Sequence, residues 1–150
     1  RTQEEGEVMS AASDYLEGQI RAHLFRTASF TKPTVLAVCL LTAAPSDAST
    51  GATIVEPPDG DGYDRQTLNP LDANWTAASA TDGLTDNASA IVFGPCTGTN
   101  WGSITHFAIC DSATYVAGNM LVYGPVATPR TIEVGDTFTF PIGDLDVTIA

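Results

Sequence analysis

The sequence predicts a mainly β fold, namely an antiparallel β-sandwich or jelly-roll-like domain with one N-terminal α-helix. Apolar runs of strand length recur along the chain, turn-forming residues separate them, and only the N-terminal part has apolar residues at helical spacing. With 150 residues, 43% of them hydrophobic and 16% charged, the chain is long enough for one core and too apolar for a disordered protein. We therefore expect a single domain over residues 13–150, preceded by an N-terminal extension or arm over residues 1–12.

The predicted helix begins at Ser13 or Asp14 and ends near Thr27. Leu16, Ile20 and Leu24 recur at every fourth residue, which places them on one helix face, and Asp14 and Glu17 have the spacing of a capping-box variant. An interior glycine at position 18 costs about 1 kcal/mol relative to Ala. A helix this short therefore needs packing, either against its own sheet or against another subunit.

The expected strands begin after Lys32-Pro33 and continue to the last residue. Residues Thr34 to Thr42, TVLAVCLLT, are almost continuously apolar, which is typical of a strand covered on both faces. The other expected strands span residues 63–69, 75–78, 87–93, 104–110, 120–123, 131–134 and 137–140. The Gly135-Asp136 turn should join the last two, so that the sheet fixes the C-terminus.

A long segment, Ala43 to Gly62, lacks both helix and strand patterns. It is rich in Pro, Ser, Thr, Asp and Gly, which predicts a surface loop. Loops longer than about 12–15 residues are uncommon unless they have a function. We interpret this loop as a candidate contact arm.

The charge distribution excludes several classes of partner. The net charge is −12, with 18 acidic residues against six scattered basic ones. Binding to nucleic acid or to an anionic membrane requires basic residues clustered on one face, so we expect neither partner. No apolar run approaches the roughly 18 residues of a membrane helix.

The cysteines are expected to be buried free thiols. Cys39, Cys96 and Cys110 are an odd number, have no CxxC spacing, and each lies in or beside an apolar run. Free thiols fit assembly in a reducing cytoplasm, and the acidic N-terminus does not resemble a signal peptide.

Two constellations suggest chemistry, but neither has the required pattern. His106 and Cys110 share a face of the predicted strand, yet they stand about 13 Å apart and their neighbours on that face, Ile104 and Ala108, are apolar. The run Asp59 to Asp64 resembles the start of a calcium loop, but the position of the bidentate acid is a proline, so a solvated turn is expected. We expect no catalytic residue, no metal, no cofactor and no enzyme activity.

The aromatic residues are expected mainly in the core. Trp75, Phe93, Trp101 and Phe107 lie within or at the start of predicted strands. Tyr63 and Tyr115 are the aromatic residues expected on the loop side, where a binding surface would use them.

Several ordered blocks of the sequence resemble a known family. They are SDYLEGQIRAHLFRTASFTKPTVLAVCLLTAAPSDAST near the start, GYDRQTLNP in the middle, and WGSITHFAICDSA, GNMLVYGPV and GDTFTFPIGDLDVTIA toward the end. From Ser10 to Ala150 the chain is similar to a widespread group of small tailed-phage virion proteins. Members of this group are often labelled tail fibre proteins, and some resemble capsid decoration, or cement, proteins.

The resemblance implies a repeated, non-enzymatic subunit whose function is to contact its neighbours. We expect a capsid decoration protein on the outer surface of the virion, assembled in the host bacterial cytoplasm, that binds the major capsid protein or other virion proteins as a trimer or dimer. The alternative is a tail fibre or tail-tip protein that attaches to the host surface, and a third possibility is an unrelated soluble binding module. The expected contact surfaces are the helix, the acidic arm and the 43–62 loop. Their candidate interface residues are Glu4, Glu5, Tyr15, Leu16, Ile20, Leu24, Ile54, Val55 and Tyr63.

Overall fold

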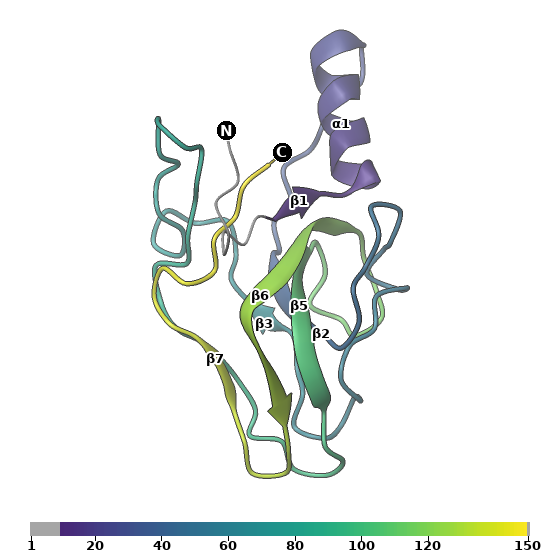
Figure 1. Ribbon diagram of the computed structural model, residues 1–150. Coiled ribbons are helices and arrows are strands. Elements are labelled where there is room, and N and C mark those ends of the chain that lie inside the picture. Colours follow the sequence, from purple (N-terminus) through teal and green to yellow (C-terminus); the bar gives the residue numbers. More distant parts are fainter. Residues whose placement is uncertain (1–9, 150) are drawn as a thin grey trace.

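Two antiparallel sheets pack against each other and enclose the main core (Figure 1). The computed structural model describes residues 10–149. In chain order the elements are β1 (Ala11–Ala12), α1 (Asp14–Phe25), β2 (Ala37–Leu41), β3 (Gln66–Thr67), β4 (Ile91–Phe93), β5 (Gly102–Cys110), β6 (Met120–Ile132) and β7 (Phe138–Phe140). The predicted fold class, mainly β and antiparallel with one N-terminal helix, is confirmed.

The larger sheet has the strand order β1-β6-β5-β2-β3, and the smaller sheet pairs β4 with β7. β5 is the central strand of the larger sheet, where it pairs with β6 from Gly102 to Cys110 and with β2 from His106 to Cys110. The expected turn at Gly135 is present, with the positive φ that favours glycine. The strands that it connects, β6 and β7, belong to different sheets, so this turn passes the chain from one layer to the other.

Several predicted strands differ from the observed ones in extent. β3 and β4 are shorter than the expected strands at 63–69 and 87–93, and residues 75–78 contribute only an isolated bridge from Trp75 to Asn87. The strands expected at 120–123 and 131–134 are parts of one strand, β6. β6 continues through Pro125 and Pro129. They are tolerated because β1 pairs with β6 only at Val122 and Tyr123, so the prolines lie where β6 is an edge and its N–H groups need no partner.

The two ends of the described chain are tied together. Ser10 and Thr148 are both buried, and the Ser10 hydroxyl accepts from the Thr148 amide at 2.7 Å. Because Ala11 and Ala12 form β1, the arm expected over residues 1–12 is too long; residues 10–12 are part of the fold, and residues 1–9 lie outside the described part. After β7 the chain does not continue as a strand as expected, but an isolated Thr85–Val147 bridge fixes it.

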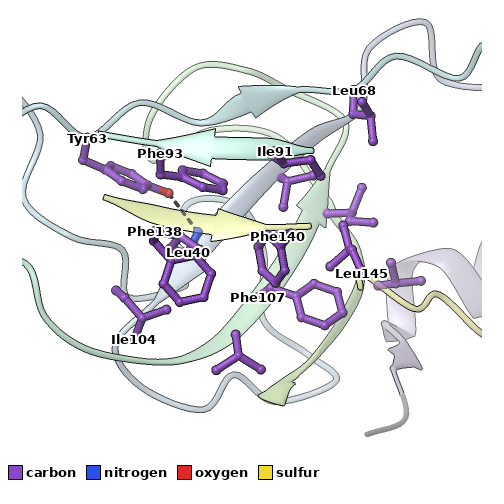
Figure 2. Close-up of a cluster of buried hydrophobic side chains, with 14 of the residues drawn as sticks. Leu40, Tyr63, Leu68, Ile91, Phe93, Ile104, Phe107, Phe138, Phe140 and Leu145 are labelled. Carbon is purple, nitrogen blue, oxygen red and sulfur yellow. Dashed lines mark hydrogen bonds between the residues drawn. The ribbon is translucent and has the colours of Figure 1, made fainter. Parts of the chain in front are cut away.

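An aromatic cluster fills the space between the sheets (Figure 2). Phe93 of β4 contacts Phe138 and Phe140 of β7 edge to face, with ring centroids 6.5 and 6.3 Å apart. Phe140 meets Phe107 of the larger sheet in the same geometry, and Tyr63 stacks on Phe93. These contacts join the small sheet to the large one, and burial of such side chains stabilises the fold by roughly 1.5–3 kcal/mol each.

A second, smaller cluster covers the opposite face of the larger sheet. Its buried members include Cys39 and Leu41 of β2, Cys110 of β5, Met120 of β6 and Ile54 from the 43–62 loop. Since all residues of β2 are buried, the prediction that this strand is covered on both faces is confirmed. The 43–62 loop provides part of this cover and is packed against the sheet through Ile54, while its role as a contact arm stays a prediction.

A buried ion pair fixes this loop to the sheet. The side chains of Arg65 and Glu56 are 0% and 1% exposed, and Arg65 Nη2 lies 2.7 Å from Glu56 Oε2. Arg65 also donates to the backbone carbonyls of Gly51, Ser112 and Ala117, so each guanidinium nitrogen has an acceptor. Burial acts to lower the pKa of Arg65, but the hydrogen bond to Glu56 and the neighbouring groups Cys39 and Glu56 raise it overall, so the guanidinium stays charged.

Tyr63 extends the same network into the main core. Its hydroxyl donates to Glu56 Oε1 at 2.7 Å and accepts from the Leu40 amide at 3.1 Å, the contact drawn in Figure 2. Burial, followed by the neighbouring Cys39 and Glu56, raises the pKa of Tyr63 well above its ordinary value. The hydroxyl therefore remains a donor, and Tyr63 is a core residue with 2% exposure instead of the loop-side aromatic that was expected.

A buried asparagine fixes the segment after β7. The side chain of Asn87 is fully buried, and its Nδ2 donates to the carbonyls of Ser89 and Pro141 at 2.7 and 2.8 Å. Its Oδ1 accepts from the Leu145 amide at 2.9 Å. One amide side chain thus satisfies backbone groups before β4 and after β7, and this requires donors and an acceptor on the same residue.

We expect Glu56→Gln to lower the free energy of unfolding by about 3–5 kcal/mol, because Arg65 then stays buried without its counter-charge. Urea denaturation measures this as a shifted midpoint with an unchanged slope. The matched control is Glu17→Gln, which breaks the exposed pair between Glu17 and Arg21 and should cost about 0.5 kcal/mol or less. Equal effects of the two variants would contradict the assigned role of the buried pair.

We expect Asn87→Asp to lower the free energy of unfolding by about 2–3 kcal/mol, because a carboxylate oxygen replaces the donor that faces two carbonyls. Asn100→Asp is the control, since Asn100 is exposed and uses only its oxygen, which accepts from the Val134 amide. That variant should stay within about 0.5 kcal/mol of the parent protein in the same denaturation experiment. An unchanged midpoint for Asn87→Asp would show that the three hydrogen bonds are dispensable.

Candidate interaction surface

The base of α1 is fixed to the sheet. Ser13 is the N-cap: its hydroxyl accepts from the Leu16 amide at 3.2 Å and donates to the Met120 carbonyl. The spacing of Asp14 and Glu17 predicted the cap at Asp14, with Glu17 as its capping-box partner, which is one residue too late. Ser13 precedes the first helical position and has the extended backbone that a cap requires. The Asp14 amide also donates to the Asp47 carbonyl, so the 43–62 loop contributes to the anchor.

The C-terminal half of α1 projects away from both sheets (Figure 1). Leu16, near the base, is 6% exposed, whereas Leu24 and Phe25 at the far end are 65% and 82% exposed. The Arg26 amide closes the helix by donating to the Ala22 carbonyl. α1 therefore presents two large apolar side chains at its tip, an arrangement that is costly in water and typical of a contact surface.

The charges of α1 are separated along its length. The first turn carries Asp14 and Glu17, and the second half carries Arg21, His23 and the cap residue Arg26. This order is favourable for the helix dipole, which attracts acids at the N-terminus and bases at the C-terminus. It also gives the helix an acidic base and a basic tip.

An apolar groove of about 790 Å³ lies at the foot of α1. Its lining comes from the helix base, the segment before β2, the 70–78 region, β5, β6 and the C-terminal segment. The apolar groove is defined here by Leu16, Leu36, Trp75, Leu121, Val122 and Val147. Trp75 is half-buried and donates from Nε1 to the Leu68 carbonyl at 3.0 Å, which fixes the indole as one wall. The groove is suited to apolar side chains of a partner.

A second cavity of about 500 Å³ lies between β6 and β7. Arg130, Asp144 and Asp146 contribute its charged groups. Burial, together with the nearby acids Asp86, Asp144 and Asp82, raises the pKa of Asp146 above its ordinary value. Over residues 10–149, no group of three or more His, Cys, Asp or Glu side chains is placed to hold a metal ion.

The structure divides the expected interface residues into exposed and buried sets. Leu24 and Val55 are exposed at 65% and 53%, and Tyr15 and Ile20 are half-buried on α1. Leu16, Ile54 and Tyr63 are buried in the chain's own core, so the expectation that they face a partner is wrong. Their burial follows from the packing of the helix base and the 43–62 loop on the sheet. Glu4 and Glu5 lie outside the described residues.

Sequence reasoning missed Phe25, which has the largest exposed fraction among the large hydrophobic residues of the described part. It lies outside the fourth-residue repeat of Leu16, Ile20 and Leu24. The available signal was its position at the end of a short helix, directly before Arg26 in the sequence LFR. Charged residues lie mostly on the surface, so an apolar residue beside one at a helix end is often exposed as well.

The two residues considered for catalysis, His106 and Cys110, each contact another side chain in the structure. Cys110 is fully buried, and its sulfur lies 3.8 Å from that of Cys39, while His106 Nδ1 contacts Thr105 Oγ1 at 2.9 Å. Burial lowers the pKa of His106, and burial with the Cys110 contact raises the pKa of Cys39. A raised pKa keeps a thiol protonated and a poor nucleophile. All three cysteines are free and buried, as predicted.

Ile104 and the turn at residues 59–64 both pack against the main core. Ile104 does not share a face with Cys110, because a register irregularity between Ile104 and His106 places Ile104 in the main core. The Asp59 to Asp64 run contains a turn whose Gly60 and Gly62 have positive φ, and the Asp61 carbonyl accepts from Trp101 Nε1. This turn therefore packs against the core through its backbone.

The core assignment of the aromatic residues is confirmed for Phe93, Trp101 and Phe107, which are at most 2% exposed. Tyr115 was expected on the loop side, but it is half-buried, and its hydroxyl donates to the Pro57 carbonyl at 3.1 Å. It also meets Tyr63 edge to face. Tyr115 is therefore used to hold two loops together.

In the part of the chain that the structure describes, no helix is both long and apolar enough to span a membrane. No curated protein matches the sequence. The family model described as "Podophage GP4 fiber I protein gp80" matches residues 11–148, which is almost the whole chain and includes every helix and strand described above. The chain therefore belongs to the Gp80 family of tailed-phage virion proteins, which are of the tail fibre type.

Proposed function

We propose that this protein is a structural subunit of the tail fibre apparatus of a tailed phage, and that it acts by binding other virion proteins. The observation that carries this proposal is the match of residues 11–148 to a fibre protein family. The sequence alone favoured capsid decoration over a tail location. The description of the family favours the fibre, so the order of the two candidates is reversed here.

The distribution of exposed side chains supports a role in protein contacts. Large exposed hydrophobic residues in the described part are aliphatic, with Phe25 as the one aromatic among them. Surfaces that bind glycans typically present aromatic rings, whereas protein interfaces combine aliphatic and aromatic anchors with a charged rim. The tip of α1 has the second composition: Leu24 and Phe25, flanked by Arg21 and Arg26.

The packing of the loops supports the same role. The long 43–62 loop, which would be the natural place for a binding or catalytic loop, is held by Glu56 and Ile54 against the sheet. A structural subunit has to transmit force without changing shape, and buried polar networks contribute to such rigidity. We propose that the body of the protein is a rigid spacer, that α1 carries its contacts, and that it catalyses no reaction.

Capsid decoration remains the second candidate, because some members of the group that the sequence resembles look like cement proteins and the domain is small and acidic, with a net charge of −12. In that role many copies would brace the shell through contacts of on the order of 1,000 Å² each. The partner would then be the major capsid protein in place of a tail protein.

Quantitative mass spectrometry of purified virions distinguishes these roles. A fibre subunit should be present at far fewer copies than the major capsid protein, and it should remain with the tails when heads and tails are separated. Copy numbers comparable to that of the major capsid protein, in the head fraction, would contradict the fibre role and favour decoration. Absence from infectious particles would contradict both.

A further inference from the structure

The tip of α1 and the apolar groove are complementary surfaces on the same molecule. Leu24 and Phe25 are exposed at 65% and 82% at the end of a helix that projects from the body (Figure 1). The apolar groove lies at the foot of that helix, and Leu16 belongs to both the helix and the groove. A molecule cannot place its own helix tip in the groove at the base of the same helix, but a second copy can.

Helix length determines how two copies would fit. Leu16 and Phe25 are nine positions apart, or about 13–14 Å at a rise of 1.5 Å per residue. If two α1 helices lie side by side and antiparallel, the tip of each reaches the base of the other, where the groove begins. Such a pair has a two-fold axis between residues 20 and 21, and both contacts are then identical, as in an isologous dimer.

Charge favours this orientation over a parallel one. An antiparallel pair places the basic tip of each helix, with Arg21 and Arg26, beside the acidic base of the other, with Asp14 and Glu17. A parallel pair would place like charges together. The chain has 18 acidic and six basic residues, so most of its surface repels a second copy, and α1 carries two of those bases at its exposed end.

We propose that two copies of this protein associate through an antiparallel pair of α1 helices, with Leu24 and Phe25 of each copy in the apolar groove of the other. This inference deepens the proposed structural role by naming one partner, a second copy of the chain. The dimer proposal rests on the structural role only for the purpose that the dimer has in the virion, and the association of two copies does not depend on that role. Self-association is measured on the purified protein and incorporation is measured in particles, so either can fail without the other.

The first test is sedimentation velocity of the purified chain over a range of concentrations. The parent protein should dimerise, and Leu24→Ser combined with Phe25→Ser should weaken dimerisation at least about tenfold, because two apolar anchors are lost. The matched control combines Val92→Ser and Val134→Ser, which also removes two exposed apolar side chains, at 49% and 54%, from the smaller sheet and the turn before it. The control should dimerise as the parent does, and circular dichroism should show that all variants are folded.

A charge test uses the expected contact of Arg26 with the acidic helix base. Arg26→Glu should weaken the dimer, and the double variant Arg26→Glu with Glu17→Arg should recover part of the loss, because opposite charges again face each other. Raising the salt concentration should weaken the parent dimer in the same direction. No recovery in the double variant would contradict the antiparallel arrangement.

Cysteine cross-linking reports the orientation directly. In the antiparallel pair, position 17 of one helix lies opposite position 24 of the other, whereas the two copies of position 24 are separated by about 10 Å along the helix. A mixture of Glu17→Cys and Leu24→Cys proteins should form a mixed disulfide with copper-phenanthroline as the oxidant, and Leu24→Cys alone should not. The native cysteines are buried, so the parent protein is the control for their reactivity.

The outcomes that overturn the proposal are specific. Efficient cross-linking of Leu24→Cys with itself would indicate a parallel pair. A parent protein that stays monomeric at all concentrations, or a control variant that loses dimerisation as strongly as the helix-tip variant, would exclude α1 as the self-association surface. The groove would then be assigned to a different virion protein.

Discussion

The buried pair of Arg65 and Glu56 is the constraint on which the rest of this structure depends. An ion pair with exposed fractions of 0% and 1% is tolerated only when every hydrogen-bonding group around it is satisfied, and here the backbone carbonyls of three loop positions complete the set. The same guanidinium therefore holds the 43–62 loop and the 111–119 loop on one face of the larger sheet. Within the described residues, no buried side-chain nitrogen or oxygen lacks a hydrogen-bond partner. A buried network in which every polar group has a hydrogen-bond partner fixes the positions of the loops as well as stabilising the fold.

The consequence is a body with fixed loops and one projecting element. The main core joins two sheets, the second cluster joins the loop to the outer face, and the contacts of Ser10 and Asn87 fix the segments before β1 and after β7. α1 differs because only its base is anchored, while Leu24 and Phe25 remain in solvent. In the role proposed above, the body sets the distance between attachment points, the helix provides the attachment, and the separated charges of α1 orient the neighbour that binds it.

Sequence patterns predicted local structure better than long-range contacts. The apolar run of β2, the fourth-residue repeat of α1 and the buried cysteines depend on neighbours in sequence, and the structure confirms each of them. The burial of Tyr63 and the packing of the 43–62 loop depend on Arg65 and on loop carbonyls far along the chain. No local sequence pattern reveals these contacts. The continuity of β6 through its prolines was hidden for a similar reason, since it depends on β1 leaving that edge unpaired. At the interaction surface, the stripe that contains Leu24 was predictable from spacing. Phe25 and the groove were not, because exposure and concavity are properties of the assembled fold.

Native-state hydrogen exchange of the purified monomer tests the central claim, a rigid body with fixed loops, most directly. The Thr42 amide, directly before the packed loop, donates to the Val55 carbonyl, and the Gly51 amide, within the loop, donates to the Gly118 carbonyl. If the loop is part of the cooperative body, these amides exchange with the same free energy of opening as the amides of β2, while those in the distal half of α1 exchange much faster. Fast exchange at Gly51 and Thr42 beside protected amides in β2 would contradict this account, because it would show a mobile loop on a stable sheet.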